Sequence, residues 1–345
     1  DVAPSRGLGD VYKRQNLYRV MEMKKLYVVV PCYNEEETLV DSTYKLTQKL
    51  NSLISDKKIT EDSRIYYIDD GSKDSTWALI EKLHNENSFV NGIKLSKNRG
   101  HQNALLAGLM SVKNECDCCI TIDADLQDDI NSFDEMIEKF EQGYEIVYGV
   151  RNDRKSDTAF KRGTAQLYYK ILSFFGAEIV YNHADYRLMS SRALDALESF
   201  KEVNLFLRGL IPLIGFNSCT VEYSRKERLY GETKYSLKKM VALALDGITS
   251  FSVKPIRMIT VTGFFSLLLG VGMLIYSLVQ WKLGNTIRGW TSLIWSIWTV
   301  GGLELLALGI IGEYIAKIYL ETKARPRFII EKVLDDKGED GKKCK

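Results

Sequence analysis

Short apolar runs alternate with longer amphipathic stretches over the first half of the chain. Each apolar run is brief and rich in β-branched residues, which is typical of strands buried in a parallel sheet. Such strands are predicted at 26–30, 65–68, 93–95, 118–122 and 146–148, with one more near 219–223. Between them the apolar residues recur at helical spacing, which predicts helices over 35–50, from 74 or 75 to 83, over 101–112 and around 133–140. The alternation, with short connections, predicts a doubly wound α/β sheet.

Two long apolar stretches dominate the C-terminal third of the chain. Residues 258–281 hold no charged side chain, and this length suffices for a helix that spans a bilayer. The second stretch, 289–318, is interrupted by Glu304 and Glu313. The linker between the stretches is too short to be a domain, so the pattern predicts a transmembrane helical hairpin. Lys and Arg are more numerous outside the hairpin than in its linker, which places both termini and the α/β domain in the cytoplasm.

The chain divides on this basis into a leader, the α/β domain, a short basic segment, the hairpin and a tail. Residues 1–22 match no structural pattern, and 10–15 resembles translated sequencing adapter, so we expect the natural chain to begin at Met21 or Met23. The α/β domain is expected over 23–225, the basic juxtamembrane segment over 226–257 and the hairpin over 258–318. The cytoplasmic tail, 319–345, is expected to be partly disordered after Phe328.

Composition and charge narrow the class of protein. A hydrophobic content of 45% in 345 residues supports a sizeable core. The net charge of +2 argues against nucleic acid as the main partner, because a protein that binds a duplex would carry a strong basic excess. Six cysteines without zinc-finger spacing form neither a disulfide scaffold nor a zinc site. They are expected to be reduced core residues, which is typical of a cytosolic domain.

The candidate chemistry centres on residues 118–129, where an apolar strand is followed by a group of carboxylates. If the chain stays extended there, Asp123 and Asp125 project to the same side at the carboxyl end of the strand. Two carboxylates are the expected protein share of a Mg2+ or Mn2+ site that a substrate pyrophosphate completes. The alternative is structural, since Asp128, Asp129 or Asn131 would serve as the cap of the next helix.

Other polar clusters follow the predicted strands at 31–37, 69–72 and 97–101. Ligands of doubly wound sheets bind outside the carboxyl ends of the strands, so these clusters and 123–127 are expected to converge on one rim. Their convergence predicts a nucleotide site. His101, in the third cluster, either caps or packs at the start of its helix or contacts a substrate.

Two later segments are candidates for contacts with phosphate and with a membrane. Residues 225–239 carry six Lys or Arg together with Gly231 and Thr233, which suits either a phosphate site or a solvated charged loop. Residues 161–176 predict a helix that either covers the sheet or lies on a membrane surface. Between these segments Asp185 precedes another predicted helix, and it either pairs with Arg187 or Arg192 or belongs to the site.

Taken together, these segments resemble the family 2 glycosyltransferases that load a sugar onto a polyprenyl phosphate, in particular bactoprenol glucosyltransferases and dolichyl-phosphate mannose synthases. The likeness runs from residue 25 to residue 333, with its motifs in the expected order. They are VVVPCYNEEETL, IDDGSKDST, LSKNRGHQNALLAGL, DADLQDD, ADYRLMSSRAL, YGETKYSLKK, LALDGITSFSVKPIRM and IGEYIAKIYLETKARPRF. Many relatives have proline after the aspartate where this chain reads DLQDDI, a departure expected to alter a helix start and leave the metal ligands intact.

The resemblance implies a nucleotide-sugar-binding fold of the glycosyltransferase A type and a role for each motif. It implies that the nucleoside is held by Pro31, Tyr33, Glu35 and Asp69, with Asp70 nearby. It implies that a Mg2+ or Mn2+ ion and the pyrophosphate are carried by Asp123, Asp125 and Gln127. Asp125 and Asp185 are implied at the reacting centre. The implied ligands of the acceptor phosphate are Arg228, Thr233 and Lys234.

The implied reaction moves a single sugar from a nucleotide carrier to undecaprenyl phosphate at the cytoplasmic membrane, with inversion. Glucose on UDP is the first choice, and mannose and amino sugars stay open. Since a phosphate monoester is already ionised, Asp185 is a base, an acceptor-orienting group or a sugar-hydroxyl ligand. A processive polysaccharide synthase is disfavoured because Gln-x-x-Arg-Trp is absent, and an inactive nucleotide-sugar-binding adaptor is disfavoured by the intact Asp123 and Asp125. Glycines of the second apolar stretch and Glu304 favour a homo-oligomer.

Overall fold

The computed structural model describes residues 23–152, 183–203, 205–224, 254–283 and 289–335. Its centre is a mixed sheet in the order β7-β5-β6-β4-β1-β2-β3-β8. The strands are β1 Leu26–Cys32, β2 Arg64–Asp69, β3 Val90–Leu95, β4 Cys118–Thr121, β5 Ile146–Arg151, β6 His183–Ser190, β7 Ser218–Tyr223 and β8 Ile330–Leu334. Every predicted strand is therefore confirmed, and β6 and β8 are additional.

The sheet is not wholly parallel. β1 pairs in parallel with β2 and β4, β2 with β3, and β5 with β7. β6 runs antiparallel between β4 and β5, and β8 runs antiparallel to β3. The expectation of a parallel sheet is thus correct for the predicted strands and wrong for the two that the sequence did not reveal.

Helices cover both faces of the sheet, which confirms the doubly wound arrangement. One face packs against α2 Leu39–Ser55, α3 Thr76–Glu86 and α5 Phe133–Glu141, the last preceded by the short 3-10 helix η1 Ile130–Ser132. The other face packs against α4 His101–Val112, α7 Ser191–Glu198 and α8 Leu207–Leu213. The side chains alternate along the central strand, with Val28 and Val30 in the first core and Tyr27 and Val29 in the second. The described cysteines are free, and most are buried, as expected of core residues.

Three local features of the structure add to or differ from what the sequence predicts. Pro31 does not end its strand, because β4 pairs with β1 only as far as Val29, so the missing N–H of the proline interrupts no ladder on that side. Residues 185–188, for which the sequence predicted no strand, belong to β6. The segment after Phe328 is ordered as far as residue 335, since β8 pairs with β3 from Gly92 to Leu95.

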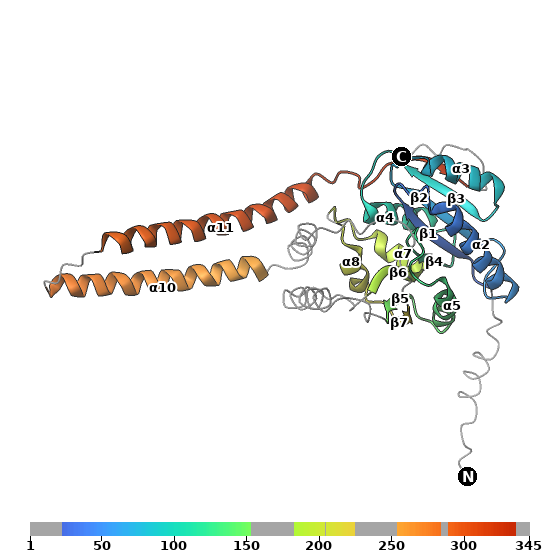
Figure 1. Cartoon of the computed structure of the whole chain (residues 1–345). Helices are drawn as coiled ribbons and strands as arrows, with labels where there is room; N and C mark the ends of the chain where they lie inside the picture. The colour runs from blue at the N-terminus through green and yellow to red at the C-terminus, as the bar shows by residue number, and fades with distance from the viewer. Residues whose placement is uncertain (1–22, 153–182, 204, 225–253, 284–288, 336–345) are drawn as a thin grey trace, which may run out of the picture.

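Two long helices extend side by side away from the α/β domain (Figure 1). They are α10 Lys254–Lys282 and α11 Trp290–Thr322, which cover the two predicted membrane stretches. Within the described residues, one segment, Lys254–Gly272 of α10, is long and apolar enough to cross a membrane. Many large apolar side chains on both helices are exposed, among them Phe265, Leu305 and Ile318. After α11 the chain returns to the α/β domain to form β8 (Figure 1).

Candidate active site

The candidate site lies at the rim where β1, β2 and β4 end. These strands are parallel, so their carboxyl ends meet at one edge and present Tyr33, Asp70 and Asp123 there. β6 runs the other way, and its register pairs Arg187 with Thr121. Because β6 is antiparallel to β4, Asp185 lies two residues beyond this pair on the side of the rim, near Asp123, although 62 positions separate them in the sequence.

His101 lies between these two carboxylates. Its Nε2 atom is 3.6 Å from Oδ1 of Asp123 and 3.7 Å from Oδ2 of Asp185. The residue is the first of α4, and its side chain is 44% exposed. His101 therefore faces the candidate site rather than only packing at the start of its helix.

Asp185 is an ion-paired carboxylate at the centre of the site. It accepts hydrogen bonds from Nη2 of Arg187 at 2.5 Å and from Nε and Nη2 of Arg208 at 3.2 and 3.0 Å. Although burial acts to raise its pKa, the two guanidinium groups hold the pKa well below the usual range. The predicted pairing with Arg187 is confirmed, whereas Arg192 pairs with Glu145 instead.

Arg187 is the more deeply buried of the two arginines that contact Asp185. Its side chain is fully buried, and its Nε and Nη1 atoms have no hydrogen-bond partner. Burial lowers the pKa of this guanidinium from its ordinary value. Asp185 thus supplies the opposite charge that keeps a buried cation in the sheet.

The acidic loop after β4 is not extended. The N–H of Leu126 donates to the carbonyl of Asp123 at 3.1 Å, and Leu126 has a φ of 44°, so residues 123–126 form a turn. The extended geometry expected for Asp123 and Asp125 is therefore wrong. Ser42 Oγ donates to the carbonyl of Ala124 at 2.6 Å and fixes the turn from α2.

The last two acids of this loop have structural roles. Asp128 is buried and accepts a hydrogen bond from the Tyr223 hydroxyl at 2.6 Å, with Arg151 Nη2 at 3.7 Å. Asp129 caps η1 by accepting from the N–H of Asn131. The capping alternative is thus confirmed for Asp129.

The donor set at Asp123 fits a hard divalent cation that a substrate completes. Partial desolvation, and then repulsion from Asp128, Asp185 and Asp125, raises the pKa of Asp123, although His101 opposes the shift. A bound cation would relieve this repulsion. In the described part of the chain, no three His, Cys, Asp or Glu side chains are close enough to hold a metal ion by themselves. Gln127 is buried beside this turn, where its backbone N–H donates to Asp125 Oδ1 at 3.3 Å.

The loops after β1 and β2 are bonded into one unit. Asn34 donates through its N–H to Ser72 Oγ at 3.0 Å and accepts from the N–H of Lys73 at 2.9 Å. The N–H of Glu35 donates to Thr76 Oγ1 at 2.9 Å. These bonds bring the predicted nucleoside residues Pro31, Tyr33, Glu35 and Asp69 to one corner of the rim. Tyr33 is 41% exposed there, whereas Pro31 is buried.

Asp69 and Asp70 are buried carboxylates with different partners. Asp70 accepts from the backbone N–H groups of Arg99 and Gly100 at 2.7 and 2.8 Å, and so fixes the loop that leads to His101. Asp69 accepts from the N–H of Ser72 through Oδ1, while its Oδ2 atom is buried without a partner. Burial raises the pKa of both groups. An orphaned buried acceptor at this rim suits a ligand that donates a hydrogen bond.

Gly71 brings this corner against the loop before α4. Its φ is +65°, and an added Cβ would lie 2.6 Å from the backbone nitrogen of Asn98 and 2.7 Å from the carbonyl carbon of Lys97. We expect Gly71→Ala to lower the free energy of unfolding by roughly 2 to 4 kcal/mol and to weaken nucleotide binding, because the loop must move. Thermal unfolding and calorimetric titration with UDP measure the two effects.

Gly143 supplies the matched control for this substitution. Its φ is +96°, but nothing lies within 4 Å of a Cβ built there. Gly143→Ala therefore carries the cost of the backbone conformation without the clash. Equal losses for the two variants, with UDP binding unchanged in both, would contradict the close-approach explanation.

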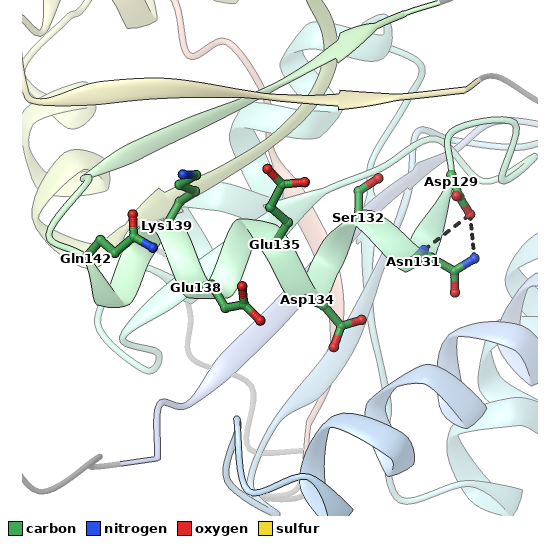
Figure 2. Close-up of a pocket in the computed structure, with 8 residues that line it drawn as sticks. All are labelled: Asp129, Asn131, Ser132, Asp134, Glu135, Glu138, Lys139 and Gln142. Atoms are coloured by element: carbon green, nitrogen blue, oxygen red, sulfur yellow. Dashed lines mark hydrogen bonds between the residues drawn. The ribbon is translucent and has the colours of Figure 1, made fainter.

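A hollow on the described surface lies elsewhere, and its lining comes from α5 and the residues just before it (Figure 2). Asp134 there is already bound by Lys49 and Lys58, and Asp129 by Asn131. This hollow is distinct from the candidate site, since none of Asp123, His101, Asp185 and Arg208 lines it.

Several predictions fall outside the described residues. The predicted acceptor-phosphate ligands Arg228, Thr233 and Lys234 lie there, as does the predicted helix 161–176. Conversely, the structure adds Arg208 of α8 to the site, which the sequence did not single out. The only local signal was an arginine within the apolar run 205–211, and its partner Asp185 is 23 positions earlier.

Comparisons with known proteins identify the family. Residues 27–197 match the model of Glycosyl transferase family 2. Uncharacterized glycosyltransferase YkoT of Bacillus subtilis (strain 168) is 53% identical over 306 residues, which cover 89% of this chain and 91% of that protein. The Bactoprenol glucosyl transferase of Shigella phage SfX is 38% identical over 89% of this chain and 99% of its own length. A prophage bactoprenol glucosyl transferase homolog of Escherichia coli (strain K12) is 37% identical over 90% and 99%, respectively.

The chain therefore belongs to glycosyl transferase family 2 and is a glycosyltransferase enzyme. The resemblance drawn from the motifs is confirmed. The likeness to the bactoprenol relatives extends over nearly their whole length, so it includes the region of α10 and α11 as well as the α/β domain.

Proposed function

We propose that the protein transfers a single sugar, glucose as first choice, from UDP to undecaprenyl phosphate, with inversion at the anomeric carbon. The observation that carries this proposal is the similarity to bactoprenol glucosyl transferases over almost their entire length. The mixed sheet with helices on both faces fits a glycosyltransferase A domain. The charged rim of Asp123, His101, Asp185 and Arg208 supplies a site suited to a diphosphate and a phosphate acceptor.

The membrane arrangement follows from α10 and α11. We propose that both cross the cytoplasmic membrane as a hairpin, with the α/β domain and both termini in the cytoplasm. The apolar candidate span in α10 and the exposed apolar side chains of α11 support this arrangement. Glu304 and the glycines of α11 favour contacts between copies, so a homo-oligomer belongs to the proposal.

The chemistry is displacement at the anomeric carbon by an oxygen of the acceptor phosphate. That oxygen is already ionised, so it must be positioned rather than deprotonated. Asp185 is held by two arginines with a pKa well below the usual range, which makes it a poor proton acceptor at neutral pH. Its role in this proposal is to orient cationic groups and, with them, the reacting phosphate.

A Mg2+ or Mn2+ ion would be held by Asp123 and Asp125, with Gln127 beside them. When bound, the ion would stabilise the negative charge that the departing diphosphate gains. The nucleoside would lie at the corner formed by Pro31, Tyr33, Glu35 and Asp69. There, the buried Oδ2 of Asp69 has no hydrogen-bond partner, and a base or ribose would supply one if its binding opens this corner.

The test is transfer of label from nucleotide sugars into lipid. Purified protein in detergent is incubated with Mg2+, undecaprenyl phosphate and, separately, radiolabelled UDP-glucose, UDP-N-acetylglucosamine or GDP-mannose. We expect label from one donor, UDP-glucose first, to enter the lipid phase. We expect Asp125→Asn to lower that transfer by about 100-fold or more, a loss of roughly 3 kcal/mol of transition-state stabilisation.

Asp129→Asn is the matched control, because it changes the charge of the same loop at a residue that caps η1. It should leave transfer within about threefold of the natural protein. If UDP binds but none of the donors labels the lipid, the enzyme uses another donor or acceptor, and the proposed reaction is wrong as stated. Label in a growing polymer would instead favour the processive synthase.

A further inference from the structure

Arg208 lies on α8, and the N-terminus of this helix is capped by a side chain from α4. α8 begins at Leu207, and its preceding residue Phe206 makes no side-chain cap. The N–H of Leu207 would otherwise be one of the unsatisfied donors at a helix start. It donates instead to Oε1 of Gln102 at 2.9 Å, across 105 positions of sequence. Gln102 therefore joins the first turn of α4 to the first turn of α8.

The first two residues of α4 contact two different parts of the candidate site. His101 places its imidazole between Asp123 and Asp185, and the next residue, Gln102, reaches α8. Asp70 fixes the position of this start by accepting from the N–H groups of Arg99 and Gly100. A shift of α4 relative to α8 would thus move His101 and Arg208 with respect to each other.

Arg208 can bind an anionic ligand, because Asp185 is also paired with Arg187 and the Arg208 side chain is partly exposed. Fully buried Arg187 already supplies one positive charge to this carboxylate. Arg208 supplies a second, and it is the partly exposed one, with 37% of its side chain accessible. Asp185 is thus contacted by two guanidinium groups, and the exposed one, Arg208, has N–H groups with the geometry to bind phosphate oxygens of a substrate.

We propose that Gln102 is a positioning residue of the transfer reaction: it caps α8 and holds the Arg208 guanidinium beside Asp185, where it binds phosphate oxygens of a substrate. The identity of the ligand as a phosphate rests on the proposed function. The phosphate belongs either to the donor diphosphate or to the acceptor, and both present the same ionised oxygens to Arg208.

The first test compares two substitutions of Gln102 in the full-length protein. Gln102→Met removes the acceptor but keeps the length of the side chain, and it should lower kcat/KM by about tenfold, as loss of a helix cap would. Gln102→Glu keeps an oxygen acceptor and should recover most of that loss. Gln48→Met is the control, because Gln48 is exposed on α2 and bonds only to Tyr44 in the described structure.

A double-mutant cycle distinguishes positioning from a general loss of stability. If Gln102 acts through Arg208, the double variant Gln102→Met/Arg208→Met should be no less active than Arg208→Met alone. Arg208→Lys keeps the positive charge and tests whether activity requires the two hydrogen bonds that a guanidinium donates side by side. Multiplicative losses in the double variant, or normal kinetics for Gln102→Met, would overturn the proposal.

Binding measurements identify the phosphate and separate this proposal from the proposed function. Calorimetric titration with UDP and Mg2+ requires no acceptor. Weaker UDP binding by Arg208→Met and Gln102→Met places Arg208 at the donor diphosphate, whereas a raised KM for undecaprenyl phosphate alone places it at the acceptor. No change in either overturns the inference. If the natural protein transfers no sugar to lipid, the proposed function fails, while the UDP titration still tests the link between Gln102 and Arg208.

Discussion

Asp185→Ala is expected to lower the free energy of unfolding by roughly 3 to 5 kcal/mol, because it leaves a buried cation without its partner. Arg187 is fully buried, and two of its nitrogens already lack hydrogen-bond partners. Removing Asp185 takes away the hydrogen bond that holds its third nitrogen. For an α/β domain of this size, the loss corresponds to a fall in Tm of roughly 10 °C. Thermal unfolding in detergent measures it.

Asp185→Asn keeps the shape of the side chain and removes only its charge. It should lower the free energy of unfolding less than the alanine variant does. It should still lower sugar transfer strongly, since an amide cannot accept the two charge-assisted hydrogen bonds that Arg208 donates to Asp185. Asp195→Asn is the control, because Asp195 pairs with Lys113 and its side chain is 56% exposed. Equal stability of the Asp185 and Asp195 variants would contradict the buried-pair argument.

The pH dependence of this effect has a definite sign. The folded pKa of Asp185 lies well below its usual range, whereas in the unfolded chain it should be about 3.9. The ion pairs therefore contribute fully above that unfolded value, and their contribution falls as the pH drops toward the folded pKa. The difference in Tm between the natural protein and Asp185→Asn should be constant from about pH 8 to about pH 5 and shrink below about pH 4. A difference that grows with acid would contradict the assignment.

The sequence predicted well the elements whose side chains all lie in the same kind of environment, such as strands that are buried on both faces. β1, β2 and β4 are apolar on both faces because helices cover both, so their runs are readable without knowledge of their neighbours. α4 was predicted over 101–112 and found over the same residues, since a loop with glycine precedes it and its apolar face is continuous. These strands also fixed the rim, and with it the positions of Asp70 and Asp123.

β6 was missed because two charged residues lie within it, and one of them is also paired by a distant residue, Arg208. In His183–Ser190, Asp185 and Arg187 alternate with buried Tyr186 and Leu188, a pattern that indicates an exposed strand or a loop. Arg187 is nevertheless fully buried and the Asp185 side chain is only 9% exposed, because Asp185 pairs with both Arg187 and Arg208. The motif resemblance implied that Asp185 lies at the reacting centre. The antiparallel register of β6, which brings Asp185 near Asp123, cannot be predicted from the local sequence.

The turn that begins at Asp123 could not be predicted from the sequence for a different reason. Leu126 adopts a positive φ, which is uncommon for a residue other than glycine or asparagine. The surrounding contacts, including Ser42 to the carbonyl of Ala124, impose it. The role expected of Asp123 and Asp125 stays a prediction, whereas the extended backbone expected to carry them is wrong.

The C-terminal strand yields the second large effect. β8 covers the edge of β3, and its Leu334 is buried against the position of Gly92. Glu331 pairs with Lys94 at 3.1 Å, and Lys332 pairs with Glu81 at 3.0 Å. The same segment is joined to the domain before the strand begins, because Arg327 Nη2 donates to the carbonyl of Phe200 at 2.6 Å.

Truncation after Phe328 should therefore lower the free energy of unfolding by roughly 3 kcal/mol or more, through lost strand pairing and lost burial. It uncovers β3, which leads directly into the loop that Asp70 holds and then into His101. We expect the truncated protein to melt roughly 6 to 12 °C lower and to bind UDP more weakly. Truncation after Asp335 is the matched control, because it removes part of the same charged tail and keeps β8. If both truncations melt at the temperature of the full chain, β8 contributes nothing to the fold and the tail is dispensable. If only the truncation after Phe328 lowers the Tm and weakens UDP binding, the chain beyond α11 completes the sheet that carries the candidate site.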